Sequence, residues 1–191
     1  MNTAYTTDQR FEKLDLTQAP LPAGEYEGCE FSGCDFSGTD LGGFRFVDCA
    51  FSGCNLSNAR LQKTVFRDAI FKSCKMLGLR FDDCSGFGLS FRFEDCVLSH
   101  SSFHNTSIKQ TVFHSCRLHE VDFSRCDLTG STFAVCDIAG AAFDGTNLEK
   151  TDFRTAINYN LDPENNRLKK ARFSVDGLAG LLGKYGIVIE A

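Results

Sequence analysis

Large apolar residues recur at every fifth position along most of the chain. One series runs without exception through residues 26–81, and a second runs through residues 93–153. Leu168 and Phe173 return to the second series, and fifteen of the 19 phenylalanines occupy this position. A period of five fits neither the 3.6-residue repeat of a helix nor the two-residue repeat of a strand. The chain must therefore turn a corner once in every unit.

Small residues occupy most of the positions two before a large one. Nine of the ten cysteines fall there, Cys84 falls two before Gly86 where the first series fails, and the other residues at this position are mostly Ala, Thr and Ser. Four units close a square coil of 20 residues, in which the large and the small residue point inward and the three others point outward. Coils stack at the sheet spacing of about 4.8 Å. Each coil buries its apolar face only against its neighbours, which predicts a solenoid.

Several units also match a known consensus. The segments 54–58 (CNLSN), 126–130 (CDLTG) and 146–150 (TNLEK) resemble the A(D/N)LXX unit of the pentapeptide-repeat proteins. The resemblance covers residues 26–153 almost continuously and resumes at 166–173. It implies an all-β fold, a right-handed quadrilateral β-helix, to which we add a short C-terminal α-helix.

The repeat divides the chain into three parts. Residues 1–25 are expected to form an N-terminal cap segment, residues 26–173 the β-helix, and residues 174–191 a C-terminal helix and strand. Two extra residues between Phe81 and Phe93 predict a register break at 82–92. A turn-rich stretch predicts that the chain leaves the coil at 154–166.

The tail is predicted to serve in dimerisation. Ser174 can cap its helix, Gly186 can end it, and residues 187–189 can form a strand. The tail is too apolar to stay solvated, so it covers the last coil or joins two copies about a two-fold axis. It resembles the C-terminal dimerisation module of the gyrase-interacting branch of the family, which includes the albicidin and microcin immunity proteins, Qnr and MfpA. The expected dimerisation residues are Leu178, Leu181, Leu182, Tyr185, Ile187 and Ile189.

The cysteines and histidines do not suggest catalysis or metal binding. The cysteines lie at inward positions, where a free thiol packs as a small hydrophobe, and the four histidines lie at outward positions. We expect no enzyme activity, no catalytic residue, no metal site and no cofactor. No stretch is apolar over 18 residues and the first residues carry no apolar leader, so the sequence predicts a cytoplasmic protein without membrane contact.

Charge suggests a surface for a partner. The net charge is -5, which disfavours direct nucleic-acid binding, and residues 111–152 carry 7 acids and 3 bases. An acidic rod can imitate a DNA phosphate backbone. The resemblance implies a non-enzymatic DNA mimic that binds DNA gyrase or topoisomerase IV and modulates it, or protects it from a quinolone, albicidin or microcin type of poison. The alternative is a structural or protein-interaction solenoid with no topoisomerase role. The residues expected to form the acidic partner-binding surface are Asp122 and Asp144, one turn apart on one face, Asp127 and Glu149, one turn apart on the next, and Asp137 and Asp152 on neighbouring walls.

Overall fold

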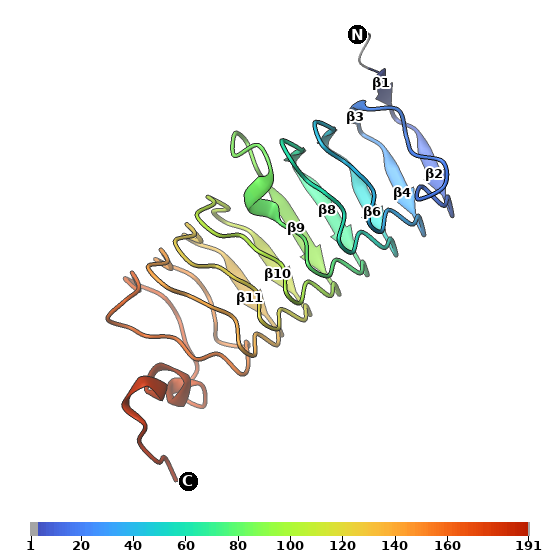
Figure 1. Cartoon of the computed structure of the whole chain (residues 1–191). Coiled ribbons are helices and arrows are strands. Elements are labelled where there is room, and N and C mark those ends of the chain that lie inside the picture. Colours follow the sequence, from blue (N-terminus) through green and yellow to red (C-terminus); the bar gives the residue numbers. More distant parts are fainter. Residues whose placement is uncertain (1–3, 191) are drawn as a thin grey trace.

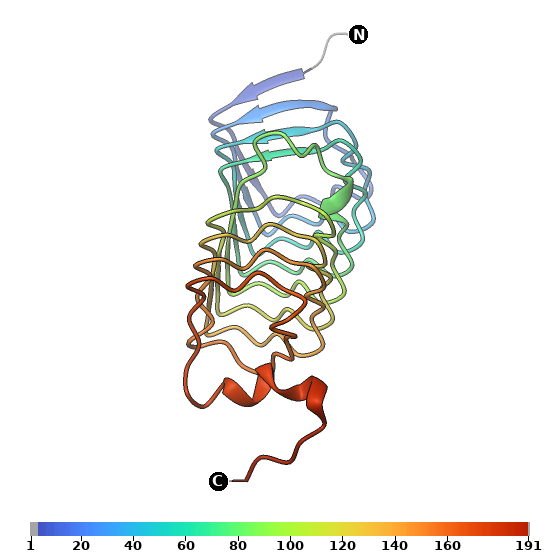
Figure 2. The same ribbon diagram turned by 90° about the vertical axis from the view of Figure 1, so that its left-hand side faces the viewer.

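The coils of the chain stack along one axis, from the N-terminal end to a tail that lies across the last coil (Figures 1 and 2). The computed structural model describes residues 4–190. Within this range the strands form two parallel sheets, and the only helices are short 3₁₀ turns. The predicted all-β quadrilateral β-helix is confirmed.

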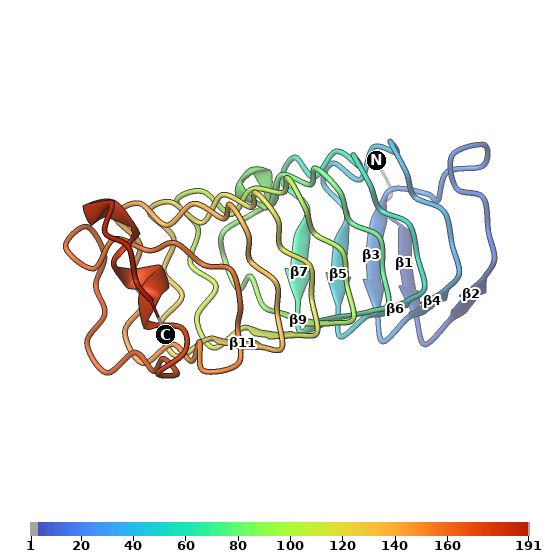
Figure 3. The same ribbon diagram turned by 90° about the horizontal axis from the view of Figure 1, so that it is seen from below.

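Two neighbouring faces of the coil carry the sheets (Figure 3). Partner residues are 20 apart, so Tyr26 lies beside Phe46 on face 1 and Phe31 lies beside Phe51 on face 2. The sheet of face 1 contains β1 (Ala4–Thr7), β3 (Gly24–Glu27), β5 (Arg45–Val47) and β7 (Val65–Arg67). The sheet of face 2 contains β2 (Arg10–Glu12), β4 (Glu30–Ser32), β6 (Ala50–Ser52), β8 (Ala69–Lys72), β9 (Phe91–Glu94), β10 (Val112–His114) and β11 (Thr132–Ala134).

The other two faces are joined mainly by single bridges. Face 3 includes the bridge of Asp15 with Asp35, and face 4 includes the bridge of Asp40 with Arg60. The corner residue that ends most units has a positive φ, as at Asn58 with φ 56°. This conformation suits Gly, Asn and Asp, and it explains the glycines that punctuate the repeat.

Aromatic rings stack inside the coil in continuous columns. On face 2 nine phenylalanines stack from Phe11 to Phe173 with centroids 4.8 to 5.4 Å apart, one ring per coil. Because rings contact rings of the neighbouring coils, the core is continuous along the rod. The inward residues are almost all buried, as the five-residue period requires.

The register break lies where the repeat predicts it. Strands β8 and β9 pair Ala69 with Phe91, 22 residues apart. The added length forms the 3₁₀ turn η1 (Phe81–Asp83) and a loop at 84–90, whose Phe87 is 84% exposed. Phe91 occupies a normally small position and packs 5.7 Å from Phe66 and 5.2 Å from Phe81. Its ring and the buried Leu89 of the loop fill the space at the position where the series of large inward residues is interrupted by Gly86.

The cysteines belong to one type of corner. At most corners on faces 3 and 4 the backbone closes a turn, as in the bond from Ala59 N to Leu56 O. At the corners that follow the strands no such bond forms, and the thiol donates to nearby carbonyls instead, as Cys54 does to Phe31 O (3.3 Å) and Ser52 O (3.5 Å). All ten cysteines are free thiols, and burial raises the pKa of Cys49 to about 12. The eight that lie at corners of this second type are Cys29, Cys34, Cys49, Cys54, Cys74, Cys96, Cys116 and Cys136.

The N-terminal segment is a coil and not a separate cap. Strand β1 pairs with β3 and β2 pairs with β4, and Leu16 is 3% exposed. The boundary expected at Tyr26 is therefore not a structural one, because Phe11, Leu16 and Leu21 keep the five-residue step. Residues 1–3 of the predicted cap lie outside the described range.

The excursion at 154–166 keeps the register of the coil. Ile157 bridges to Asp137 and Arg167 bridges to Asn147, both 20 residues apart. Only residues 158–166 leave the regular path, and Asn166 ties this turn back through its side-chain amide to Phe143 O at 2.7 Å.

The tail differs from the prediction in its type of helix. Ser174 Oγ accepts a bond from Gly177 N, and Gly186 ends the helical segment at φ 61°, both as expected. However, the segment consists of two 3₁₀ turns, η2 (Leu178–Leu181) and η3 (Gly183–Tyr185), and residues 187–189 form no strand.

A three-residue glycine spacing explains the 3₁₀ form. Residues three apart lie on one line of a 3₁₀ helix, which has 3.0 residues per turn. A Cβ at Gly177 would lie 2.0 Å from Tyr159 Oη, and one at Gly180 would lie 2.3 Å from Tyr159 O. Gly183 lies in the same way over Asn160. The bare glycine line thus packs directly on the last coil, which an α-helix with 3.6 residues per turn could not keep aligned.

Candidate partner-binding surfaces

The six acids predicted to bind a partner lie on four different faces. Each pair expected to share a face does so, and Asp137 and Asp152 lie on the remaining two. Asp122 and Asp144 belong to face 4, Asp127 and Glu149 to face 1, Asp137 to face 3, and Asp152 to face 2. These acids therefore encircle the C-terminal coils and do not gather into one patch.

Asp152 is closed off by two guanidinium groups. Its side chain is 12% exposed, and its Oδ2 lies 2.8 Å from Arg154 and 3.0 Å from Arg172. The hydrogen bond from Arg154, with the charge of Arg172, holds the pKa of Asp152 below its usual range against the effect of burial. This carboxylate is neutralised within the protein and presents little negative charge to a partner.

Three of the other predicted acids also have a basic neighbour. Asp127 lies 3.2 Å from Lys109 Nζ, Asp122 lies 3.5 Å from His104 Nδ1, and Asp137 lies 2.8 Å from His119 Nε2. Burial acts to raise the pKa of Asp127, but the hydrogen bonds from Thr129 and Lys109 outweigh it and lower the value.

The last two predicted acids have no cation in an ion pair within residues 4–190. Asp144 accepts a hydrogen bond from the Asn165 amide, and Glu149 stands at an outward position of face 1. The free negative charge of the predicted set is therefore concentrated in these two residues.

A row of acids that the sequence reasoning did not single out lies on the edge between the two sheets. We call this line the inter-sheet edge, and it holds one corner residue per coil. In the N-terminal coils it carries Asp8, Asp48 and Asp68, each with φ 51°, and Glu27 lies beside it. None of the four takes part in an ion pair between described residues; Glu27 accepts from Tyr5 Oη at 2.5 Å and Asp68 from Ser90 Oγ at 3.0 Å.

A signal for this row was present in the sequence. Residues 1–50 carry 9 acids and 3 bases, and Asp48 and Asp68 are 20 residues apart, which places them on one corner of a 20-residue coil. The predicted acidic residues instead lie in residues 111–152, the stretch near the expected dimer axis.

The predicted dimerisation residues divide between the core and the surface. Leu181 packs against the core, while Leu178 is 46%, Tyr185 56% and Ile187 56% exposed. Leu182 and Ile189 are also exposed. An open cavity of about 490 Å³ lies between this tail and the last coil, beside Asn158.

The described part of the chain holds no group of three or more side chains placed to bind a metal ion. None of its helices has the length and apolar character needed to span a membrane. Open grooves also lie between coils, such as one of about 650 Å³ beside Asp40 and Lys63 and one of about 350 Å³ beside Phe91 and Lys109.

Comparisons with known proteins agree with the repeat. A family model described as pentapeptide repeats (8 copies) matches residues 29–68 and 49–85, and one described as a pentapeptide repeat region matches residues 87–153. Together these matches cover most of the coils. The chain belongs to the pentapeptide-repeat family. No curated protein matches the chain.

Two solved structures show the same fold. One is QnrB1, a plasmid-mediated fluoroquinolone resistance protein, in a trypsin-treated variant; it is 23% identical, covers 97% of this chain and 99% of its own, and has a TM-score of 0.52. The other is HetL, a pentapeptide repeat protein involved in heterocyst differentiation regulation from the cyanobacterium Nostoc sp. strain PCC 7120. HetL is 15% identical, with coverage of 90% and 88% and a TM-score of 0.65.

Proposed function

We propose that this protein is a non-enzymatic partner of a type II topoisomerase, DNA gyrase or topoisomerase IV, and acts in the cytoplasm. It occupies the DNA-binding groove of the enzyme by imitating DNA, and thereby modulates the enzyme or protects it from a poison of the quinolone, albicidin or microcin type. The observation that carries this proposal is the row of unpaired carboxylates along a stiff rod.

The spacing of that row supports the imitation of a phosphate backbone. Neighbouring coils place charges on the inter-sheet edge about 4.8 Å apart, so Asp48 and Asp68 are one step apart and Asp8 and Asp48 are two. A positively charged groove attracts such a row over several ångströms before contact. Fold likeness to a fluoroquinolone resistance protein over nearly the whole of both chains adds to this.

The predicted C-terminal acids contribute a second negative surface. Asp144 and Glu149 lie on neighbouring faces close to the tail. In a dimer joined through its tails, these acids of both copies would lie near the centre of a rod of double length. The exposed apolar residues Tyr185, Ile187 and Ile189 support such a dimer, since buried apolar contact would stabilise it.

A supercoiling assay with gyrase, run with and without a poison, tests the proposal. The variant Glu27→Lys/Asp48→Lys/Asp68→Lys should lose its effect on gyrase. The variant Asp122→Lys/Asp127→Lys/Asp144→Lys/Glu149→Lys should lose part of it. The matched control Glu12→Lys/Asp15→Lys/Asp95→Lys changes the charge by the same amount as the first variant on other surfaces and should retain it. No effect of the wild-type protein at tens of micromolar would overturn the proposal.

The tail dimer has its own test. Sedimentation at micromolar concentration should give a dimer, and Ile187→Asp/Ile189→Asp should give a monomer without loss of the folded coil. A wild-type monomer under these conditions would contradict the dimer but leave the acidic surface to be judged by the supercoiling assay.

The second candidate function is a protein-interaction solenoid with no topoisomerase role. The fold likeness to HetL, whose printed role is regulation of differentiation, favours it. In that case neither the wild-type protein nor either acidic variant would change supercoiling by gyrase, and the partner would be a protein other than a topoisomerase.

A further inference from the structure

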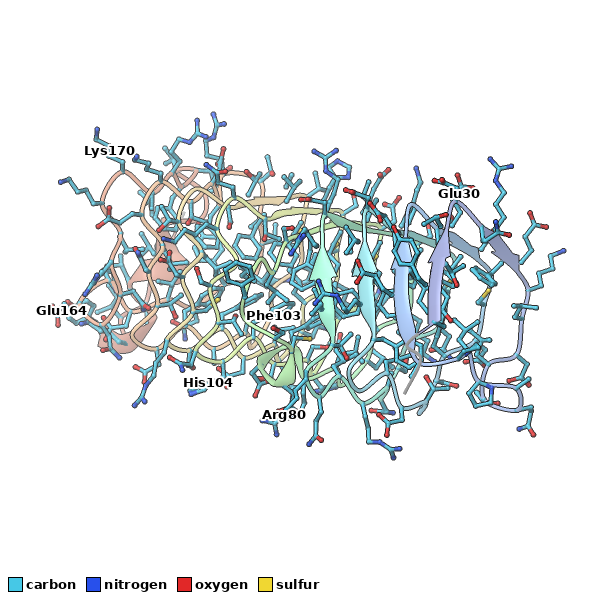
Figure 4. All side chains as sticks on the ribbon, turned by 90° about the horizontal axis from the view of Figure 1, so that it is seen from above. Glu30, Arg80, Phe103, His104, Glu164 and Lys170 are labelled. Atoms are coloured by element: carbon cyan, nitrogen blue, oxygen red, sulfur yellow. The ribbon has the colours of Figure 1, made fainter. Side chains whose placement is uncertain are left out.

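The inter-sheet edge changes sign along the rod. Beyond the loop at 84–90 its corner residues are Gln110, Gly130, Lys150 and Lys170, all with positive φ. Figure 4 shows Lys170 projecting from the same side of the rod as Glu30, at the opposite end. The row that begins with aspartates therefore ends with lysines.

Further cations surround the two lysines. Arg167 and Lys169 point outward from face 1, and Arg154 and Arg172 flank the edge on face 2. Lys150 N bonds to Lys169 O at 3.0 Å, so these residues belong to consecutive coils about 4.8 Å apart. We call this surface the cationic end; it consists of Lys150, Arg154, Arg167, Lys169, Lys170 and Arg172.

Four of these six cations are free of acidic partners. Arg154 and Arg172 share Asp152, whereas Lys150, Arg167, Lys169 and Lys170 are exposed and form no ion pair within residues 4–190. Glu149 lies beside Lys150 in the chain and one coil before Lys169, at the same outward position of face 1. Such uncompensated like charges cost stability and would not be expected on a surface that serves packing alone.

The acids of the same edge do not cancel this charge at a distance. Asp68 lies four coils away from Lys150, which is about 19 Å at the sheet spacing. Salt at physiological strength screens exposed charges beyond about 8 Å. A polyanion that meets the cationic end is therefore attracted locally, although the whole chain carries a net charge of -5.

The composition of the surface favours phosphate over an acidic protein. A protein interface has an apolar centre and is depleted in lysine, whereas this surface has three lysines. The outward residues of the last three coils on face 1 are all polar or charged: Asp127, Thr129, Asn147, Glu149, Arg167 and Lys169. Contacts with a nucleic-acid backbone need only Lys and Arg that displace counterions.

We propose that the cationic end binds the phosphate backbone of a nucleic-acid duplex without reading its sequence. This goes beyond the topoisomerase proposal and departs from the expectation, drawn from net charge, of no direct nucleic-acid contact. The four free cations set the strength of binding, which falls in the range of about 10⁻⁴ to 10⁻⁶ M that is usual for non-specific contacts. The two arginines held by Asp152 keep the edge of the surface rigid.

Fluorescence anisotropy with a short labelled DNA duplex tests this proposal. Four neutralised phosphates predict a slope of log K against log salt of about -3.6. The variant Lys150→Ala/Arg167→Ala/Lys169→Ala/Lys170→Ala should bind at least about tenfold more weakly at low salt and should flatten the slope. The control Lys63→Ala/Lys75→Ala/Arg117→Ala/Arg125→Ala removes the same charge from other surfaces and should bind as the wild type does, and circular dichroism should show both variants folded.

Several outcomes would overturn the proposal. One is an absence of wild-type binding at low salt. Another is an equal loss of binding in the two variants, which would indicate only a general effect of charge. Poly-glutamate that competes as well as DNA would point to an acidic protein partner instead. Since gyrase is absent from this experiment, its result is independent of the supercoiling assay.

Discussion

The two halves of the rod, before and after the loop at 84–90, fill their cores differently. Both halves stack phenylalanines on face 2. In the N-terminal half the second aromatic column lies on face 1, at Tyr26, Phe46 and Phe66; in the C-terminal half it lies on face 4. That later column begins with Phe81, just before the loop, and continues through Phe103, Phe123 and Phe143. Leucine and isoleucine fill face 1 once the aromatic column has left it.

The interior is filled in both halves, but the face that carries the second column of rings differs between them. Rings and aliphatic residues together fill each coil whichever faces the rings occupy, because interiors pack to nearly uniform density. The exchange of faces happens where the loop removes an inward residue from face 1. Phe91 sits between the two columns and joins them.

The same border separates the charges of the inter-sheet edge. Before the loop the edge carries carboxylates, and beyond it the edge ends in lysines. One molecule thus presents a row of carboxylates and a row ending in lysines along one line, in different halves of the rod.

The largest effect on stability is expected from substitution of Phe91, whose ring joins the two aromatic columns. Phe91→Ala should lower the free energy of unfolding by about 3 to 5 kcal/mol, because it leaves a cavity between Phe66 and Phe81. Urea denaturation followed by circular dichroism measures this. Phe87→Ala, in the same loop but 84% exposed, should change the value by less than about 0.5 kcal/mol. Equal effects of the two changes would contradict the bridging role of Phe91.

The next largest effect on stability is expected at the covered C-terminal end, where the tail glycines pack on the last coil. Gly180→Ala should cost about 1 to 3 kcal/mol, because its Cβ would meet the backbone and ring of Tyr159. Gly183→Ala should cost less, since its Cβ meets the movable Asn160 side chain. Limited proteolysis should release the tail of Gly180→Ala while the N-terminal coils remain protected. A tail equally protected in both variants would show that the glycine line does not control its packing.

A smaller effect concerns the buried carboxylate of the C-terminal half. Asp152→Asn should lower the free energy of unfolding at pH 7 by about 1 to 2 kcal/mol, because Arg154 and Arg172 lose their partner. The pKa of Asp152 is lowered in the folded state. The carboxylate therefore stabilises the protein above the ordinary Asp pKa of about 3.9, and this contribution is lost as the pH falls through the lower folded value. The wild type and the variant should converge in stability once the pH falls below the lowered folded pKa of Asp152; a constant difference would contradict the ion pair as the cause.

The smallest effects on stability are expected from the stacked like charges at the two ends of the inter-sheet edge. Asp48→Asn/Asp68→Asn and Lys150→Gln/Lys170→Gln should each raise stability by a few tenths of a kcal/mol at low salt, because each removes repulsion between stacked like charges. Both gains should vanish at high salt. Thermal melts at two salt concentrations measure them. A gain that persists at high salt would mean that the charges on the edge do not repel one another.

The fold could be predicted because its determinant is local and periodic. Each five-residue unit states which residue points inward, and twenty residues close a coil, so the stacking of Phe31 on Phe51 follows by counting. The candidate site could be predicted only in part. Counting placed Asp122 and Asp144 on one face, but it did not show that Arg154 and Arg172, from different coils, both reach Asp152.

The amino-acid sequence by itself determined the square coil, its inward residues and the position of the register break, since these depend on spacing along the chain. The tertiary structure decided the rest. It set the 3₁₀ form of the tail through contact of Gly177 and Gly180 with Tyr159. It also decided which acids remain free, because an ion pair depends on side chains of different coils meeting across the surface, and no pattern within one unit contains that information.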